Sequence, residues 1–233
     1  MSEQRCLTKS RFKLGSECPT KLFYTRKSEY ADQKDSDSFL AALAEGGYQV
    51  GELAKQYFPS EHDIKTLKYE ESLAQTNELM QRENVIIHEA AFRHENLFIR
   101  ADMIVKKSNC IDLIEVKAKS CDPSDLPFEK KRVEWKPYLE DVAFQKYVMN
   151  RALPGYQISA YLMLADKTAS CPTDGLNQKF VITEQEDGDK EVKVSGPITE
   201  EDLNPRLLCQ IPVDDYCERI YESDGTGELL GLS

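Results

Sequence analysis

The sequence predicts a mixed α/β fold, in which three antiparallel strands are followed by a helix and by a further strand of the same sheet. Three short apolar segments rich in Ile, Val and Leu alternate with brief polar connections, at residues 85–92, 97–105 and 111–118. Residues 138–151 have the apolar spacing of a helix, and residues 157–165 are almost continuously apolar, as in the centre of a sheet. With 233 residues, 40% of them hydrophobic, the chain can bury a core of this kind.

Helices are expected before the strands. Near the N-terminus, Thr8 or Ser10 can cap a short helix that Cys18-Pro19 should end or redirect, and a second short helix is expected over residues 21–26. A polar stretch then leads to Ser38, which can cap a long helix over residues 39–57.

Three glycines lie inside this long helix, Gly46, Gly47 and Gly51. Small residues on one face allow close approach, either of a packed strand or of a site beside Glu52. A second amphipathic helix is expected over residues 69–81.

Charged residues interrupt the apolar strands. Asp102 lies within the second strand, and Glu115 and Lys117 lie within the third. Alternate residues of a strand share one face, so Glu115 and Lys117 should point the same way, and strand pairing can bring Asp102 beside them. A stable core does not need two carboxylates and an ammonium together, whereas a divalent cation with a water to be activated does. Glu89, in the first strand, is a further carboxylate that is costly unless it is paired or bound to a metal.

Beyond the third strand the periodicity weakens. Residues 119–137 contain several prolines and are expected to be a loop, either mobile over a site or an ordinary exposed excursion. In the helix that follows, Gln145 and Lys146 interrupt the apolar face. A hairpin of residues 180–182 with 191–194, a strand over 207–211 and a helix over 213–222 are expected near the C-terminus.

The net charge of −11 is concentrated at the C-terminal end, where residues 181–233 hold 14 acidic and four basic residues. The first 27 residues hold seven basic and two acidic residues. Their lysines and arginines form either a phosphate-binding surface or a solvated basic surface, and they include Lys9, Arg11, Lys13 and Lys21. An acidic protein that does not bind nucleic acid is the alternative on charge alone.

Hydropathy and cysteine content indicate a cytoplasmic protein. No apolar run is long enough to span a membrane, and the N-terminus lacks the apolar core of a signal peptide. The seven cysteines are odd in number and irregularly spaced, which favours a reducing compartment over a disulfide framework.

The order of elements and the pattern Asp102-x12-Glu115-Val116-Lys117 resemble the PD-(D/E)XK nuclease superfamily. The flanking segments LTKSRFKLGSECPTKLFY, GYQVGELAKQYFP and DVAFQKYVM are similar to RecB-like nuclease modules, in particular to an uncharacterised bacterial subfamily. The resemblance implies a restriction-endonuclease-like core in residues 1–166. Residues 167–233 would form an acidic C-terminal extension or a truncated continuation of a longer chain.

This resemblance assigns roles to particular residues. Asp102 and Glu115 would bind Mg²⁺ or Mn²⁺ together with the carbonyl of Val116, and Lys117 would hold the attacking water and stabilise charge on the phosphate. Gln145 matches a glutamine that orders the site in the family. Glu89 would line the site as a further candidate metal ligand. Glu52 stands where many relatives have a metal-binding histidine, and either Glu52 replaces that ligand or the metal is held by fewer protein ligands.

Contacts to DNA are expected from Lys9, Arg11, Lys119 and Tyr147. Tyr147 departs from the family pattern, because the tyrosine usually follows the glutamine by four residues and Met149 occupies that position here. An iron–sulphur cluster is not expected in this chain, since Cys18 has the early position of some relatives but Cys171, Cys209 and Cys217 lack their close spacing.

The leading hypothesis is therefore a Mg²⁺- or Mn²⁺-dependent nuclease that cleaves single- or double-stranded DNA in repair, recombination or phage defence. One alternative is a nucleic-acid-binding module of a larger nuclease, inactive without a missing domain or partner protein. Another is an interaction protein with a degenerate site. Whether the cut is internal or terminal, and whether DNA or RNA is preferred, stays open.

Overall fold

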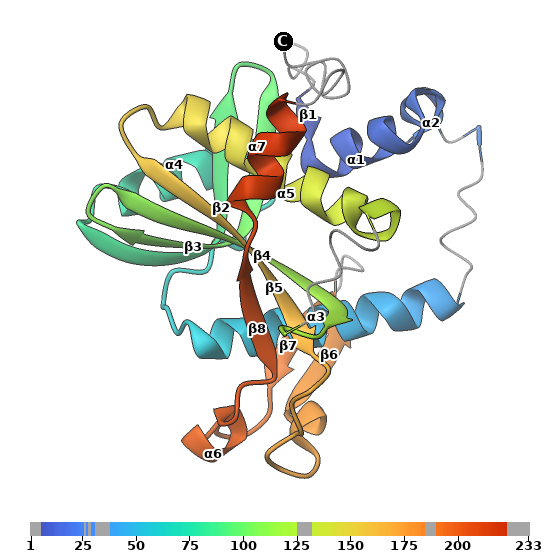
Figure 1. The fold of residues 1–233 in the computed structure, drawn as a ribbon, viewed down its shortest axis with the longest axis vertical. Helices are drawn as coiled ribbons and strands as arrows, with labels where there is room; N and C mark the ends of the chain where they lie inside the picture. Colours follow the sequence, from blue (N-terminus) through green and yellow to red (C-terminus); the bar gives the residue numbers. More distant parts are fainter. Residues whose placement is uncertain are drawn as a thin grey trace.

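The computed structural model describes residues 6–25, 27, 29–30, 38–124, 132–184 and 190–222. Within them a mixed sheet of six strands is flanked by helices, as the sequence predicts for the fold class (Figure 1). The sheet order is β1-β3-β4-β5-β8, with β2 paired to β3. The strands are β1 (Leu7–Thr8), β2 (Asn84–His94), β3 (Leu97–Lys107), β4 (Cys110–Cys121), β5 (Gln157–Asp166) and β8 (Leu208–Pro212).

The pairing confirms the three predicted antiparallel strands and the further strand. β2, β3 and β4 pair antiparallel in chain order, and β5 lies parallel to β4 after the helical crossover. β8 pairs antiparallel with β5. The short β1, which lies parallel to β3, was not predicted, because two residues carry no periodicity.

Helices cover both faces of the sheet. The α-helices within the described residues are α1 (Lys9–Glu17), α2 (Pro19–Tyr24), α3 (Ser38–Tyr57), α4 (Tyr69–Leu79), α5 (Arg132–Ala152), α6 (Glu200–Leu203) and α7 (Asp214–Glu222). One core packs α5, α1 and α7 against the sheet through residues such as Phe144, Phe12 and Cys217. A second core packs α3 through Leu53 and Ala54, beside the hairpin of β6 (Phe180–Glu184) and β7 (Lys190–Val194) (Figure 1).

The predicted N-terminal helices are present, with Thr8 capping α1 through a hydrogen bond from the Arg11 amide. The second helix begins at Pro19 rather than at residue 21, because proline is well suited to the first position of a helix.

The predicted loop over residues 119–137 is wrong at both ends; residues 125–131 lie outside the described part. β4 continues to Cys121, and α5 begins at Arg132 with Pro137 inside it. The proline removes only one backbone hydrogen bond near the start of the helix, and Trp135 and Leu139 are buried on either side of it. Burial of these side chains therefore outweighs the local signal of the proline.

The segment after Asp166 contributes to the same sheet and core through β8 and α7. Ile211, Val213 and Cys217 are buried in the core that contains α5. The division into residues 1–166 and 167–233 stays a prediction; β8, α7 and the β6-β7 hairpin of the second segment all contact the first. No helix in the described ranges has the length and apolarity needed to cross a bilayer.

Candidate functional site

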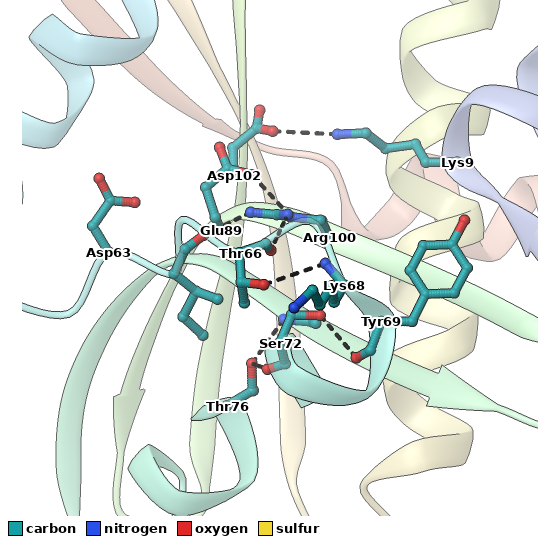
Figure 2. Close-up of polar contacts among 12 residues, drawn as sticks. Lys9, Asp63, Thr66, Lys68, Tyr69, Ser72, Thr76, Glu89, Arg100 and Asp102 are labelled. Atoms are coloured by element: carbon teal, nitrogen blue, oxygen red, sulfur yellow. Dashed lines mark hydrogen bonds and ion pairs between the residues drawn. The ribbon is translucent and has the colours of Figure 1, made fainter. Parts of the chain in front are cut away.

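Two carboxylates on adjacent strands meet one ammonium group. Asp102 lies on β3, and Glu115 lies on β4 with its side chain fully buried. The Lys9 Nζ lies 3.2 Å from Asp102 Oδ1 and 2.9 and 3.1 Å from the two oxygens of Glu115. Lys9 is the first residue of α1, and its side chain reaches Asp102 from the helical layer (Figure 2).

The ammonium of Lys117 and two side chains of α5 also contact these carboxylates. The Lys117 Nζ contacts Glu115 Oε1 and lies 3.0 Å from Asp141 Oδ2. The Gln145 amide donates to Glu115 Oε2 at 2.9 Å and to Asp141 Oδ1 at 3.2 Å. Asp141 and Gln145 are four residues apart on α5, and Glu115 and Lys117 are two apart on β4, so each pair shares a face. We call these six residues the charge cluster: Lys9, Asp102, Glu115, Lys117, Asp141 and Gln145.

Backbone contacts fix the orientation of Asp102. Its Oδ2 accepts a hydrogen bond of 2.8 Å from the Val116 amide across the two strands. Its Oδ1 is thereby directed at Lys9. The contact that Val116 makes here is through its N–H, and its carbonyl stays a predicted ligand.

Glu89 lies beside Asp102 at an irregular point of β2. The register pairs His88 with Met103 and Ala90 with Ala101, whereas Glu89, between them, has a φ of 58°. Positive φ costs a non-glycine residue on the order of 1–3 kcal/mol, so the surrounding structure must hold it in place. The side chain lies 3.5 Å from the Arg100 Nε, in the same close-up as Asp102 (Figure 2). Burial, and then the charge of Asp102, raise the pKa of Glu89 to about 7.

Charge in the cluster is unbalanced, because three carboxylates share two ammonium groups. Burial raises the pKa of Glu115, but the charges of Lys9 and Lys117 outweigh it and hold that pKa below its ordinary value. Burial followed by the charge of Glu115 raises the pKa of Asp102, and the same causes raise the pKa of Asp141 to about 6.

The pKa values of the two ammonium groups are both raised. Burial lowers the pKa of Lys9, but the carboxylates of Asp102 and Glu115 outweigh it and hold that pKa well above its ordinary value. For Lys117, Glu115 and Asp141 likewise outweigh burial and raise the pKa. Both lysines are therefore charged at neutral pH.

The charge cluster opens onto a cleft of about 1240 Å³ between α3, the β2-β3-β4 strands and β7. Glu52 and Lys55 of α3 line it, and Glu52 accepts a hydrogen bond of 3.1 Å from Gln56. Asp63 also lines it and forms an ion pair of 2.9 Å with Lys55. Lysines and an arginine that also line the cleft are Lys9, Lys65, Arg100, Lys117 and Lys190.

Three predicted DNA contacts lie outside the residues that line this cleft. The Arg11 guanidinium donates to the Cys6 carbonyl at 2.7 Å. Lys119 pairs with Glu134 and lies over the ring of Trp135, 5.0 Å from its centroid. Tyr147 packs on α5 with its ring 6.3 Å from that of Tyr221, beside Arg151. Of the four predicted contacts, Lys9 is the one that the structure brings to the carboxylates.

Sequence reasoning missed Asp141, although a signal for it exists. Asp141 precedes Gln145 by four residues, so a helix that directs Gln145 inward directs Asp141 to the same place. The contact of Lys9 with Asp102 has no local signal, because 93 residues separate the two in the chain.

A divalent cation is compatible with the residues present. Among the described residues, no group of three or more His, Cys, Asp or Glu side chains is assembled as a metal site. However, Asp102 and Glu115 direct oxygens at one shared position, where the ammonium of Lys9 stands in for a cation. Mg²⁺ is commonly held by one or two carboxylates and several waters, so this donor set fits it.

Comparisons with known proteins give little further information. No family model and no curated protein matches the chain. Among solved structures, the chain is similar to an alkaline exonuclease (LHK-Exo) from Laribacter hongkongensis, with a TM-score of 0.30 and 10% sequence identity over 97% of this chain and 84% of that one. A likeness at this level assigns neither family nor function, so the site must be interpreted from its own geometry.

Proposed function

We propose that this protein is a metal-dependent nuclease that hydrolyses phosphodiester bonds of DNA, with a site of the PD-(D/E)XK type. The observation that carries the proposal is the convergence of Asp102 and Glu115 on one cation position, with Lys117 in contact with Glu115. Folding does not require this arrangement, because burying three carboxylates around two ammonium groups costs more than burying apolar side chains of the same volume.

The residues of the charge cluster take distinct roles. Asp102 Oδ1 and the Glu115 carboxylate would hold Mg²⁺ or Mn²⁺, with the Val116 carbonyl as a further ligand, and Glu89 and Glu52 would line the outer side. A bound cation of this kind lowers the pKa of a coordinated water and withdraws charge from a phosphate oxygen. Gln145 keeps Glu115 oriented by donating to its Oε2.

Lys117 is the residue that we assign to the water and the phosphate. Its ammonium is held between Glu115 and Asp141 at the edge of the cleft, and its side chain is 22% exposed. An ammonium in this position can donate hydrogen bonds to the attacking water and to a phosphate oxygen that gains charge.

The basic residues of the cleft support a nucleic-acid substrate. Lys55, Lys65 and Lys190 line the cleft in ion pairs with Asp63, Glu191 and Glu45, respectively. Each would exchange its carboxylate for a phosphate on either side of the reacting one. Arg11, Lys119 and Tyr147 stay proposed contacts for the parts of a longer DNA strand that extend beyond the cleft.

Cleavage of end-labelled and circular DNA, single- and double-stranded, with Mg²⁺ or Mn²⁺ tests this proposal. We expect metal-dependent products whose formation falls by roughly 100-fold or more in Asp102→Asn and in Lys117→Met. The matched control is Asp112→Asn, because Asp112 lies on β4 and does not line the cleft. Cleavage that survives chelation, or that Asp102→Asn leaves intact, would contradict the proposal. DNA binding without cleavage would favour a binding module that needs a further domain.

A further inference from the structure

Lys9 occupies an unusual position for a lysine. It is the first residue of α1, where the helix dipole disfavours a cation, and the first turn of α1 contains no acidic residue to offset it. Its side chain is 24% exposed, and its ammonium group contacts two carboxylates that belong to strands far away in the chain. The stability of α1 therefore does not explain the position of this charge.

Lys9 is also the main positive partner of Asp102. Glu115 has a second ammonium in Lys117 and an amide in Gln145. The side chain of Asp102 contacts Lys9 and the Val116 amide. Without Lys9, the carboxylates of Asp102 and Glu115 would repel each other across the two strands.

The oxygens that Lys9 contacts are those that a metal ion would need. Asp102 Oδ2 accepts from the Val116 amide, and Asp102 Oδ1 faces the Lys9 ammonium. Both oxygens of Glu115 face the same ammonium, and they also accept from Lys117 at Oε1 and from Gln145 at Oε2. An ammonium group within 3.2 Å of both carboxylates cannot keep that position beside a dication, because the two charges repel and the lone pairs are shared.

We propose that Lys9 is an internal counter-ion of the site: it holds Asp102 and Glu115 together in the metal-free protein and leaves them when a divalent cation binds. Lys9 itself lines the cleft, so its released ammonium turns toward the space where a phosphate would lie. The inference rests on the proposed function, because it assumes that the two carboxylates bind a cation. It adds that binding of the cation by the two carboxylates releases the Lys9 ammonium, which can then contact a phosphate of the substrate.

Isothermal titration calorimetry tests this role: MnCl₂ is titrated into the protein in the absence of DNA, and the affinity for Mn²⁺ is measured. We expect Lys9→Met to bind Mn²⁺ roughly tenfold more tightly than the wild type or better, since a competing cation is lost. Lys9→Arg should bind no more tightly than the wild type, because it keeps the charge. Lys13→Met is the matched control, because Lys13 is an exposed lysine one turn further along α1, and it should leave the affinity unchanged.

A measurement on the wild-type protein covers the case in which Lys9→Met does not fold. Reductive methylation with formaldehyde, read by mass spectrometry, should label Lys9 slowly without metal and several-fold faster with Mn²⁺, while Lys13 reacts equally in both. Equal or weaker Mn²⁺ binding by folded Lys9→Met, or labelling of Lys9 that Mn²⁺ does not change, would overturn the counter-ion role alone. Absence of Mn²⁺ binding in the wild type and in Lys9→Met would instead overturn the proposed metal-dependent function.

Discussion

Two buried carboxylates of this protein each bind a lysine, yet their surroundings differ. Asp202, in α6, is 1% exposed and accepts hydrogen bonds from the Lys179 ammonium at 2.6 Å, the Thr199 amide at 2.8 Å and the Thr173 hydroxyl at 2.8 Å. Glu115, in the charge cluster, is fully buried beside Asp102 and Asp141. The first carboxylate meets one cation and neutral donors, whereas the second shares two cations with two further carboxylates.

From this difference we interpret Asp202 as a structural carboxylate and Glu115 as a carboxylate of the proposed site. Asp202 closes a capping box with Thr199, so its charge satisfies the N-terminus of a helix and leaves nothing in excess. Both residues have a pKa below the ordinary value, held there at Asp202 mainly by the hydrogen bond from Lys179. A lowered pKa therefore does not distinguish them, while the excess of negative charge around Glu115 does.

The largest effect is expected from Glu115→Gln. Loss of the shared ligand should reduce metal-dependent cleavage by roughly 1,000-fold, because the cation and Lys117 both depend on this carboxylate. The fold should persist, since two carboxylates and two ammonium groups remain in the charge cluster. Single-turnover cleavage and thermal unfolding measure the two effects. Cleavage within a few-fold of the wild type would contradict the assignment of Glu115 to the site.

A smaller effect on cleavage is expected from Asp141→Asn. Lys117 then keeps only Glu115 as a charged partner, so the turnover number should fall by roughly tenfold with little change in KM, as for a positioning residue. Glu140→Gln is the matched control, because Glu140 precedes Asp141 on α5 and pairs with Lys136 instead. A change in KM of the same size as that in turnover would assign Asp141 to substrate binding.

The sequence predicts the centre of this site because its signal is local. Asp102, Glu115 and Lys117 lie in strands whose apolar pattern sets their faces, and the pairing of β3 with β4 follows from a short connection. Gln145 follows from the polar interruption of a helical apolar face. These positions depend on periods of two and of 3.6 residues, which a single sequence displays.

The remaining features depend on contacts that no local pattern encodes. The approach of Lys9 to Asp102 requires the packing of α1 on the sheet, and the φ of Glu89 arises from pairing between β2 and β3. The start of α5 is set by burial of Trp135, which outweighs Pro137. Lys119 lies outside the residues that line the cleft and pairs with Glu134, and Tyr147, two residues after Gln145, lies on another face of α5 near Tyr221.

Asp202→Asn should lower stability and leave cleavage nearly unchanged, the opposite of what is expected for Glu115→Gln. The melting temperature should fall by several degrees, because Lys179 and the Thr199 amide lose a charged acceptor. Cleavage should stay within about twofold of the wild type, since Asp202 does not line the cleft. Unchanged stability with reduced cleavage would reverse the assignment of the two carboxylates.

The smallest effect is expected on the free energy of unfolding at acidic pH. The pKa of Asp202 is lower in the folded protein than the ordinary value of about 3.9, so the folded state binds fewer protons there than the unfolded state. The contribution of Asp202 to stability is therefore complete above pH of about 4 and is lost as the pH falls below it. Denaturant unfolding of wild type and Asp202→Asn at pH 6 and pH 3 should show a difference in stability that shrinks at the lower pH. A difference that stays constant would mean that Asp202 stabilises α6 through its shape and hydrogen bonds rather than through its charge.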